Sequence, residues 1–81
     1  MIISPDRFLA DLENLGKIGW VDGEGMDRPA FTPNYTAARK FVEEKMREAG
    51  LAVTVDGVGN VFGRLEGGDP SLPAVYAGSH L

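Results

Sequence analysis

The spacing of apolar residues changes at Gly50, and this change constrains the fold more than any other feature of the chain. Before Gly50, apolar residues recur every three or four positions, as on one face of a helix: Tyr35, Ala38, Phe41, Val42, Met46 and Ala49. Thr32 and Pro33 precede them as a capping hydroxyl and a first-turn proline. After Gly50 the apolar residues alternate, starting with Leu51. The sequence therefore predicts a helix over residues 33–49 that leads directly into a β-strand.

A second strand is predicted over residues 61–65, which makes a β-hairpin with residues 51–55. The connection at residues 56–60 is rich in residue types that tolerate a positive φ, and Asn60 is interpreted as one of its turn residues. The Gly57-x-Gly59 spacing does not indicate a phosphate-binding loop, because it joins two strands and lacks the third glycine.

A shorter helix is predicted over residues 5–15, with an apolar stripe that indicates packing against the rest of the chain. Gly16 supplies its expected end. The connection at residues 16–32 is long for a loop without structure. Its three acidic residues do not have the spacing of a calcium-binding EF-hand loop. Arg28 is either a contact for an anionic substrate or, more simply, a surface ion pair or solvated side chain.

Composition limits the classes of function that fit the chain. The length allows one small domain at most, so we expect residues 1–81 to belong to one domain with no second one; cysteine is absent, which excludes disulfides and Cys-based zinc sites. The net charge of −4 argues against a nucleic-acid surface. No run approaches the roughly 20 apolar residues of a membrane span, and the N-terminus, residues 1–6, lacks the features of a signal peptide. We therefore expect a cytoplasmic protein without nucleic-acid or membrane partners.

The apolar run at residues 73–78 leads to the single histidine of the chain, His80. Apolar residues without alternation are typical of a strand covered on both faces, as in the centre of an α/β sheet. Ligands of open α/β sheets bind beyond the carboxyl ends of the strands, where His80 would lie. A lone histidine is otherwise an ordinary surface or packed residue. Ser79 does not complete a catalytic triad with it, because neighbouring strand residues point to opposite faces.

Three stretches together resemble the start of the N-carbamoyl-L-amino-acid amidohydrolases. They are the helix 33–49 with Glu48-Ala-Gly-Leu51, the hairpin Val55-Asp-Gly-Val-Gly-Asn-Val-Phe-Gly-Arg-Leu65, and Ala77-Gly-Ser-His-Leu81. The segment Asp27-Arg-Pro-Ala-Phe-Thr-Pro33 resembles the part that precedes the same helix. The group includes the allantoate amidohydrolases and β-ureidopropionases, within the wider family of di-metal aminoacylase-like exopeptidases.

The resemblance implies an α/β catalytic domain whose N-terminal part would be residues 1–81: helix, helix, β-hairpin and central-type strand, incomplete as it stands. It also implies two divalent metal ions, zinc or manganese, with His80 as one ligand and a bridging aspartate directly after Leu81. The family's general base and other ligands lie later and match no residue here. The implied reaction hydrolyses the carbamoyl or ureido C–N bond of a small-molecule substrate, an N-carbamoyl amino acid, allantoate or a related ureido acid. The implied full-length enzyme is a homodimer.

Two interpretations of the 81 residues stay open at this point. The first is part of such an amidohydrolase, inactive alone because most of its site lies outside the chain. The second is a small protein-interaction module or gene remnant that retains the family's N-terminal fold without catalysis and pairs an exposed strand edge with another chain.

Overall fold

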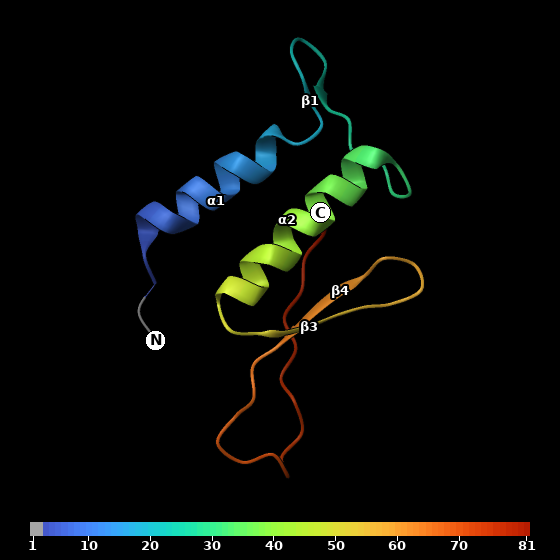
Figure 1. Ribbon diagram of the computed structural model, residues 1–81. Helices are drawn as coiled ribbons and strands as arrows, with labels where there is room; N and C mark the ends of the chain where they lie inside the picture. The colour runs from blue at the N-terminus through green and yellow to red at the C-terminus, as the bar shows by residue number, and fades with distance from the viewer. Residues whose placement is uncertain (1–2) are drawn as a thin grey trace.

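The computed structural model describes residues 3–81; Met1 and Ile2, part of the stretch considered for a leader, lie outside the described residues. Two helices and two small antiparallel sheets follow one another along the chain (Figure 1). Their bounds are α1 Pro5–Lys17, β1 Trp20–Val21, β2 Gly25–Met26, α2 Pro33–Glu48, β3 Ala52–Val55 and β4 Val61–Arg64. No helix of the described part is long and apolar enough to cross a membrane.

Both helices begin where the sequence predicts. The side chains of Ser4 and Thr32 accept hydrogen bonds from main-chain N–H groups of the first turns of α1 and α2, and a proline follows each cap. Helix α2 ends in the predicted Schellman arrangement. Gly50 has a φ of 85°, and the N–H of Leu51 donates to the carbonyl of Met46 at 3.0 Å. This stop turns the chain back toward α2 and starts β3.

The predicted end of the first helix at Gly16 is wrong. Helix α1 continues through Gly16 to Lys17, and the residue with a positive φ is Gly19, at 87°. The continuation is possible because the carbonyls of Leu15 and Ile18 at the helix end receive hydrogen bonds from the Arg28 side chain. A partner 13 residues away from Leu15 therefore sets the end of this helix, and local spacing does not reveal it.

The long connection between the helices contains a small β-hairpin that the sequence analysis did not predict. Strand β1 pairs with β2 in an antiparallel register, Val21 opposite Gly25, around a turn that includes Gly23 with a φ of 81°. At its base, the N–H of Asp27 donates to the carbonyl of Gly19 at 2.7 Å. A Cβ at Gly19 would lie 2.5 Å from the Asp27 carbonyl oxygen, so only glycine fits there.

The predicted second hairpin is present as β3 and β4, paired antiparallel with Val55 opposite Val61. Helix α2 packs against both strands and against α1, so it connects the elements of the fold (Figure 1). Gly63 faces α2 closely, since a Cβ there would lie 2.9 Å from the Met46 sulfur. Ala38 is the one apolar side chain of the described residues that is fully buried. The core of this assembly is therefore thin.

The predicted central-type strand at residues 73–78 does not form in the structure. Residues 73–81 have no regular secondary structure, and Val75 and Tyr76 are 98% and 82% exposed. A strand exists only when a neighbour accepts and donates its main-chain hydrogen bonds. Neither described two-stranded sheet includes this segment, which leaves β4, turns and runs back in the direction of α2 (Figure 1).

Candidate functional site

His80, the predicted metal ligand, lies near the end of the extended segment and is exposed. The hydroxyl of Ser79 is 3.5 Å from the main-chain carbonyl oxygen of His80, to which it donates, so it engages the backbone and not the imidazole. In residues 3–81 no three His, Cys, Asp or Glu side chains come together in a group that could hold a metal ion. Within the described chain, His80 is thus a single donor.

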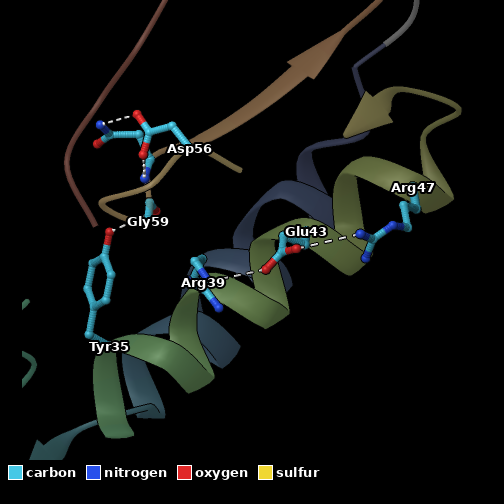
Figure 2. Close-up of polar contacts among 7 residues, drawn as sticks. Tyr35, Arg39, Glu43, Arg47, Asp56 and Gly59 are labelled. Atoms are coloured by element: carbon cyan, nitrogen blue, oxygen red, sulfur yellow. Dashed lines mark hydrogen bonds and ion pairs between the residues drawn. The ribbon is translucent and has the colours of Figure 1, made fainter. Parts of the chain in front are cut away.

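A cluster of polar contacts holds the turn between β3 and β4 (Figure 2). One oxygen of the Asp56 carboxylate accepts from the N–H groups of Val58 at 3.0 Å and Asn60 at 2.9 Å. The other oxygen accepts from the side-chain amide of Asn60 at 2.8 Å. The interpretation of Asn60 as a turn residue is confirmed. Both carboxylate oxygens of Asp56 are engaged in holding this turn.

The same contacts set the charge state of Asp56. The side-chain amide of Asn60, followed by the main-chain N–H of Asn60, holds the pKa of the Asp56 carboxyl below its ordinary value. The carboxyl therefore stays ionised to a lower pH than a free aspartate. An ionised carboxylate whose lone pairs already accept hydrogen bonds from the turn is a structural anchor and is poorly suited to act as a general acid.

The turn is joined to α2 through Tyr35, whose hydroxyl donates to the carbonyl of Gly59 at 3.2 Å (Figure 2). Gly59 has a φ of 89°. A Cβ at this position would lie 3.5 Å from the ring of Tyr35 and 3.5 Å from the guanidinium of Arg39, both on α2. Further along α2, Glu43 lies 3.3 Å from Arg39 and 3.5 Å from Arg47. The Glu43–Arg47 pair is one that the helical spacing predicts.

Arg28 forms no ion pair with another described residue, which removes one of the roles that the sequence analysis considered, whereas contact with an anionic substrate stays a prediction. One guanidinium nitrogen donates to the carbonyls of Leu15 at 2.8 Å and Ile18 at 3.1 Å, at the end of α1. A cation at the C-terminus of a helix also interacts favourably with the helix dipole. Arg28 therefore has a structural role. Asp22 likewise engages a neighbour by accepting from the Trp20 indole N–H at 3.1 Å.

An apolar groove lies between α1, α2 and the start of β3. Its lining side chains are mostly apolar: Phe8, Leu12, Leu15, Phe41, Val42, Met46, Ala49 and Leu51, with Asp11 and Lys45. Lys45 lies 3.5 Å from Asp11 and 5.6 Å from the centre of the Phe41 ring. Its hydrogen bond to Glu48 and the charge of Asp11 raise the pKa of Lys45. The raised pKa keeps the Lys45 amine protonated, which makes it a poor nucleophile, and we interpret the groove as an incompletely covered packing surface.

The amino-acid sequence was compared with family models and with curated proteins. No family model matches the chain. Over 79 residues, 98% of the chain, it is 47% identical to an N-carbamoyl-L-amino-acid amidohydrolase of Pseudomonas sp. (strain NS671). Over 80 residues it is 40% identical to an N-carbamoyl-L-amino acid amidohydrolase of Geobacillus stearothermophilus. The chain resembles the N-carbamoyl-L-amino-acid amidohydrolases along nearly its whole length. An allantoate deiminase 2 of Glycine max is 34% identical over 76 residues, so the allantoate branch is similar as well.

These matches confirm the resemblance stated from the motifs, and they also limit it. The chain spans 19%, 20% and 16% of the length of these three relatives. About four-fifths of each relative therefore has no counterpart in these residues. The β-ureidopropionase branch, the metal ions and the role of His80 stay predictions.

Proposed function

We propose that this chain is the N-terminal portion of the catalytic domain of a metal-dependent amidohydrolase. The enzyme hydrolyses the carbamoyl or ureido C–N bond of N-carbamoyl amino acids or related ureido acids. The observation that carries the proposal is the 47% identity, over 98% of the chain, to a protein named N-carbamoyl-L-amino-acid amidohydrolase. The proposal includes a homodimeric full-length enzyme in the cytoplasm.

The donor chemistry of His80 fits its proposed role as a ligand of one of two zinc or manganese ions. Imidazole nitrogens suit divalent zinc, and none of the hydrogen bonds among residues 3–81 involves the His80 imidazole. The small neighbour Gly78 and the exposed position leave the ring accessible. When bound, such metal ions supply the Lewis acidity that polarises a carbamoyl carbonyl and activates water.

The number of donors does not fit a complete site in these residues. A catalytic zinc site takes three protein ligands, and His80 has no partners in the described chain. Under the proposal the remaining ligands and the general base come from residues outside these 81. The chain alone, supplied with substrate and with zinc or manganese, should release no ammonia. Turnover by the 81-residue chain would contradict this part of the proposal.

A chimera tests the proposal directly. The 80 residues of the Geobacillus stearothermophilus relative that match this chain would be replaced by those of the chain, which places His80 in a complete protein. We expect the chimera to hydrolyse N-carbamoyl-L-amino acids, measured by ammonia release, and to contain divalent metal measured by elemental analysis. A folded chimera without activity would refute the proposed function.

His80→Ala in the chimera should lower activity by more than about 100-fold, since even loss of an outer partner of a metal ligand costs about 10–100-fold. Metal content should fall in parallel. Ser79→Ala is the matched control, because Ser79 is the adjacent residue and its hydroxyl contacts only the backbone. A His80→Ala chimera with unchanged activity and metal content would exclude His80 as a ligand.

A second candidate function, a protein-interaction module, is favoured by the exposed apolar side chains of Val75 and Tyr76. It does not require catalysis by the 81 residues.

A further inference from the structure

The chain contains two Asp-Gly pairs, and both lie in turns that join paired strands. Asp22-Gly23 lies between β1 and β2, and Asp56-Gly57 lies between β3 and β4. In such a pair the main-chain nitrogen of the glycine can attack the aspartate side chain, because glycine has no Cβ that obstructs the approach. The two pairs have the same reactive groups, so the structure around each carboxyl decides how fast each one reacts.

The reaction is a rearrangement of the main chain that requires only water. The glycine nitrogen forms a bond to Cγ of the protonated aspartate carboxyl, and the carboxyl hydroxyl leaves with the nitrogen's proton as water, which gives a succinimide ring. Water then opens the ring at either of its two carbonyl carbons. Opening at Cγ restores aspartate. Opening at the main-chain carbonyl leaves a peptide bond that runs through Cβ and Cγ, which is isoaspartate, and no atom is gained or lost overall.

The carboxylate of Asp56 is held against this reaction (Figure 2). One of its oxygens accepts from the N–H groups of Val58 and Asn60, and the other accepts from the side-chain amide of Asn60. Succinimide formation removes one of the two oxygens, so at least one of these contacts is lost whichever oxygen leaves. The same contacts lower the pKa of this carboxyl and so reduce the protonated fraction that reacts.

The carboxylate of Asp22 has fewer contacts. One oxygen accepts from the indole N–H of Trp20 at 3.1 Å, and no hydrogen bond among residues 3–81 involves the other oxygen. The main-chain N–H of Gly23 likewise donates to no group in this part of the chain. The second oxygen of Asp22 can therefore leave as water without the loss of a hydrogen bond.

We propose that Asp22 is a site of spontaneous modification, which converts to isoaspartate through a succinimide formed with Gly23. The hydrogen bonds to Asp56 protect the second pair, Asp56-Gly57, from the same reaction.

The modification would disturb the β1–β2 hairpin. Isoaspartate inserts one additional carbon atom, the former side-chain Cβ, into the main chain of a turn that the N–H of Glu24 closes on the carbonyl of Val21 at 3.0 Å. The hairpin leads directly to Arg28, whose side chain donates to the carbonyls at the end of α1. The converted chain should therefore melt at a lower temperature than the unconverted chain.

Peptide mapping of the aged 81-residue chain tests the proposal. The folded chain is incubated at 37 °C and mildly acidic pH and is then digested with trypsin, which does not cleave between Arg28 and Pro29. Asp22 is recovered in the peptide 18–39 and Asp56 in the peptide 48–64, and fragmentation in the mass spectrometer locates the isoaspartate. We expect isoaspartate at Asp22 to form at least about tenfold faster than at Asp56. Tenfold corresponds to about 1.4 kcal/mol, close to the contribution of one hydrogen bond to a charged group.

Two comparisons separate protection by the fold from an effect of sequence. In guanidinium chloride the unfolded chain should convert both pairs at rates within about twofold, because the hydrogen bonds of the Asp56 turn are then absent. In the folded Asn60→Ala chain, which lacks the side-chain contact to Asp56, conversion at Asp56 should accelerate while conversion at Asp22 stays unchanged.

Equal rates at the two sites of the folded chain would overturn the proposal, and so would faster conversion at Asp56. A difference that persists in guanidinium chloride would assign the protection to sequence and would overturn the role of the hydrogen bonds. Chains with isoaspartate at position 22 can be separated by ion exchange. An unchanged melting temperature of that fraction would contradict the expected disturbance of the hairpin.

Discussion

Replacing Arg28 by alanine should destabilise the fold by about 2 kcal/mol. The guanidinium donates to two carbonyls at the end of α1, at 2.8 and 3.1 Å. Hydrogen bonds that involve a charged group contribute about 1.5–3 kcal/mol each when well protected, and partial exposure of Arg28 lowers that value. The favourable interaction with the helix dipole is lost too, at about 0.3–1 kcal/mol. We combine these into about 2 kcal/mol, because one nitrogen makes both bonds.

Urea unfolding followed by Trp20 fluorescence and by circular dichroism measures the change. If the two probes coincide, the two-state treatment holds. A loss of about 2 kcal/mol would also lower the melting temperature by roughly 8–16 °C for a domain of this size. Arg47→Ala is the control, since Arg47 is 59% exposed and its pair with Glu43 is an i,i+4 pair within one helix, worth about 0.3–0.5 kcal/mol. An Arg28→Ala effect no larger than the Arg47→Ala effect would refute the assignment of Arg28 as the cap of α1.

Three further changes have directions fixed by the structure. Gly19→Ala should destabilise by about 2 kcal/mol or more, because φ is 87° and the new Cβ would meet the Asp27 carbonyl at 2.5 Å. Gly16→Ala should stabilise by about 0.5–1 kcal/mol, because this glycine is helical and no atom lies within 4 Å of the added Cβ. Both are measured by urea unfolding. Acid should weaken the fold through Asp56, because the hydrogen bonds from Asn60 depress the pKa of this carboxyl in the folded state. The stabilisation by Asp56 is therefore present above the ordinary aspartate pKa near 4 and is lost as the pH falls through the lower pKa of the folded state.

The glycine pair is its own control, since the same substitution should act in opposite directions at two sites three residues apart. Equal effects at both would mean that neither the φ nor the space at these positions governs stability. For Asp56, the titration is followed by NMR of the carboxyl carbon, and the Asn60→Ala variant should move its pKa back toward the ordinary value. An unchanged pKa in that variant would contradict the assigned cause.

Local features of this fold were predictable from the sequence. Thr32 with Pro33 and Gly50 with Leu51 define both ends of α2 by caps whose partners lie within one turn. The β3–β4 hairpin follows from alternation around a turn that Asp56 stabilises through its own neighbours. In each case the residues that decide the structure are close in sequence, so the pattern contains the necessary information.

Features that depend on distant partners were not predictable in the same way. The end of α1 depends on Arg28, 13 residues after Leu15, and neither residue indicates the other. The strand expected at residues 73–78 has suitable composition but no neighbour in the described chain, and composition cannot supply one. The β1–β2 hairpin was missed although Asp22-Gly23, a common hairpin-turn pair, was a usable signal.

For the candidate site, too, the sequence predicted a local property, the type of donor, but not a property that depends on distant residues, the number of donors. The type of donor, an imidazole after an apolar run, was apparent from residues 73–81. The number of donors is a property of the three-dimensional arrangement, and within residues 3–81 His80 has no companions. The resemblance to amidohydrolases suggests where companions would come from, but it does so through relatives of which this chain spans about a fifth.

The packing of α2 directly onto the strands that follow it has a consequence for the order in which the chain folds. Residues 33–64 form α2, a stop and the β3–β4 hairpin, three parts that contact one another and follow one another directly in the chain, and shorter loops close faster. During synthesis this unit is complete once residue 64 has emerged from the ribosome, before the segment at 73–80 has emerged. Helix α1, made earlier, has no surface to pack on until α2 forms. The middle of the chain should therefore fold first, and both ends should join it later.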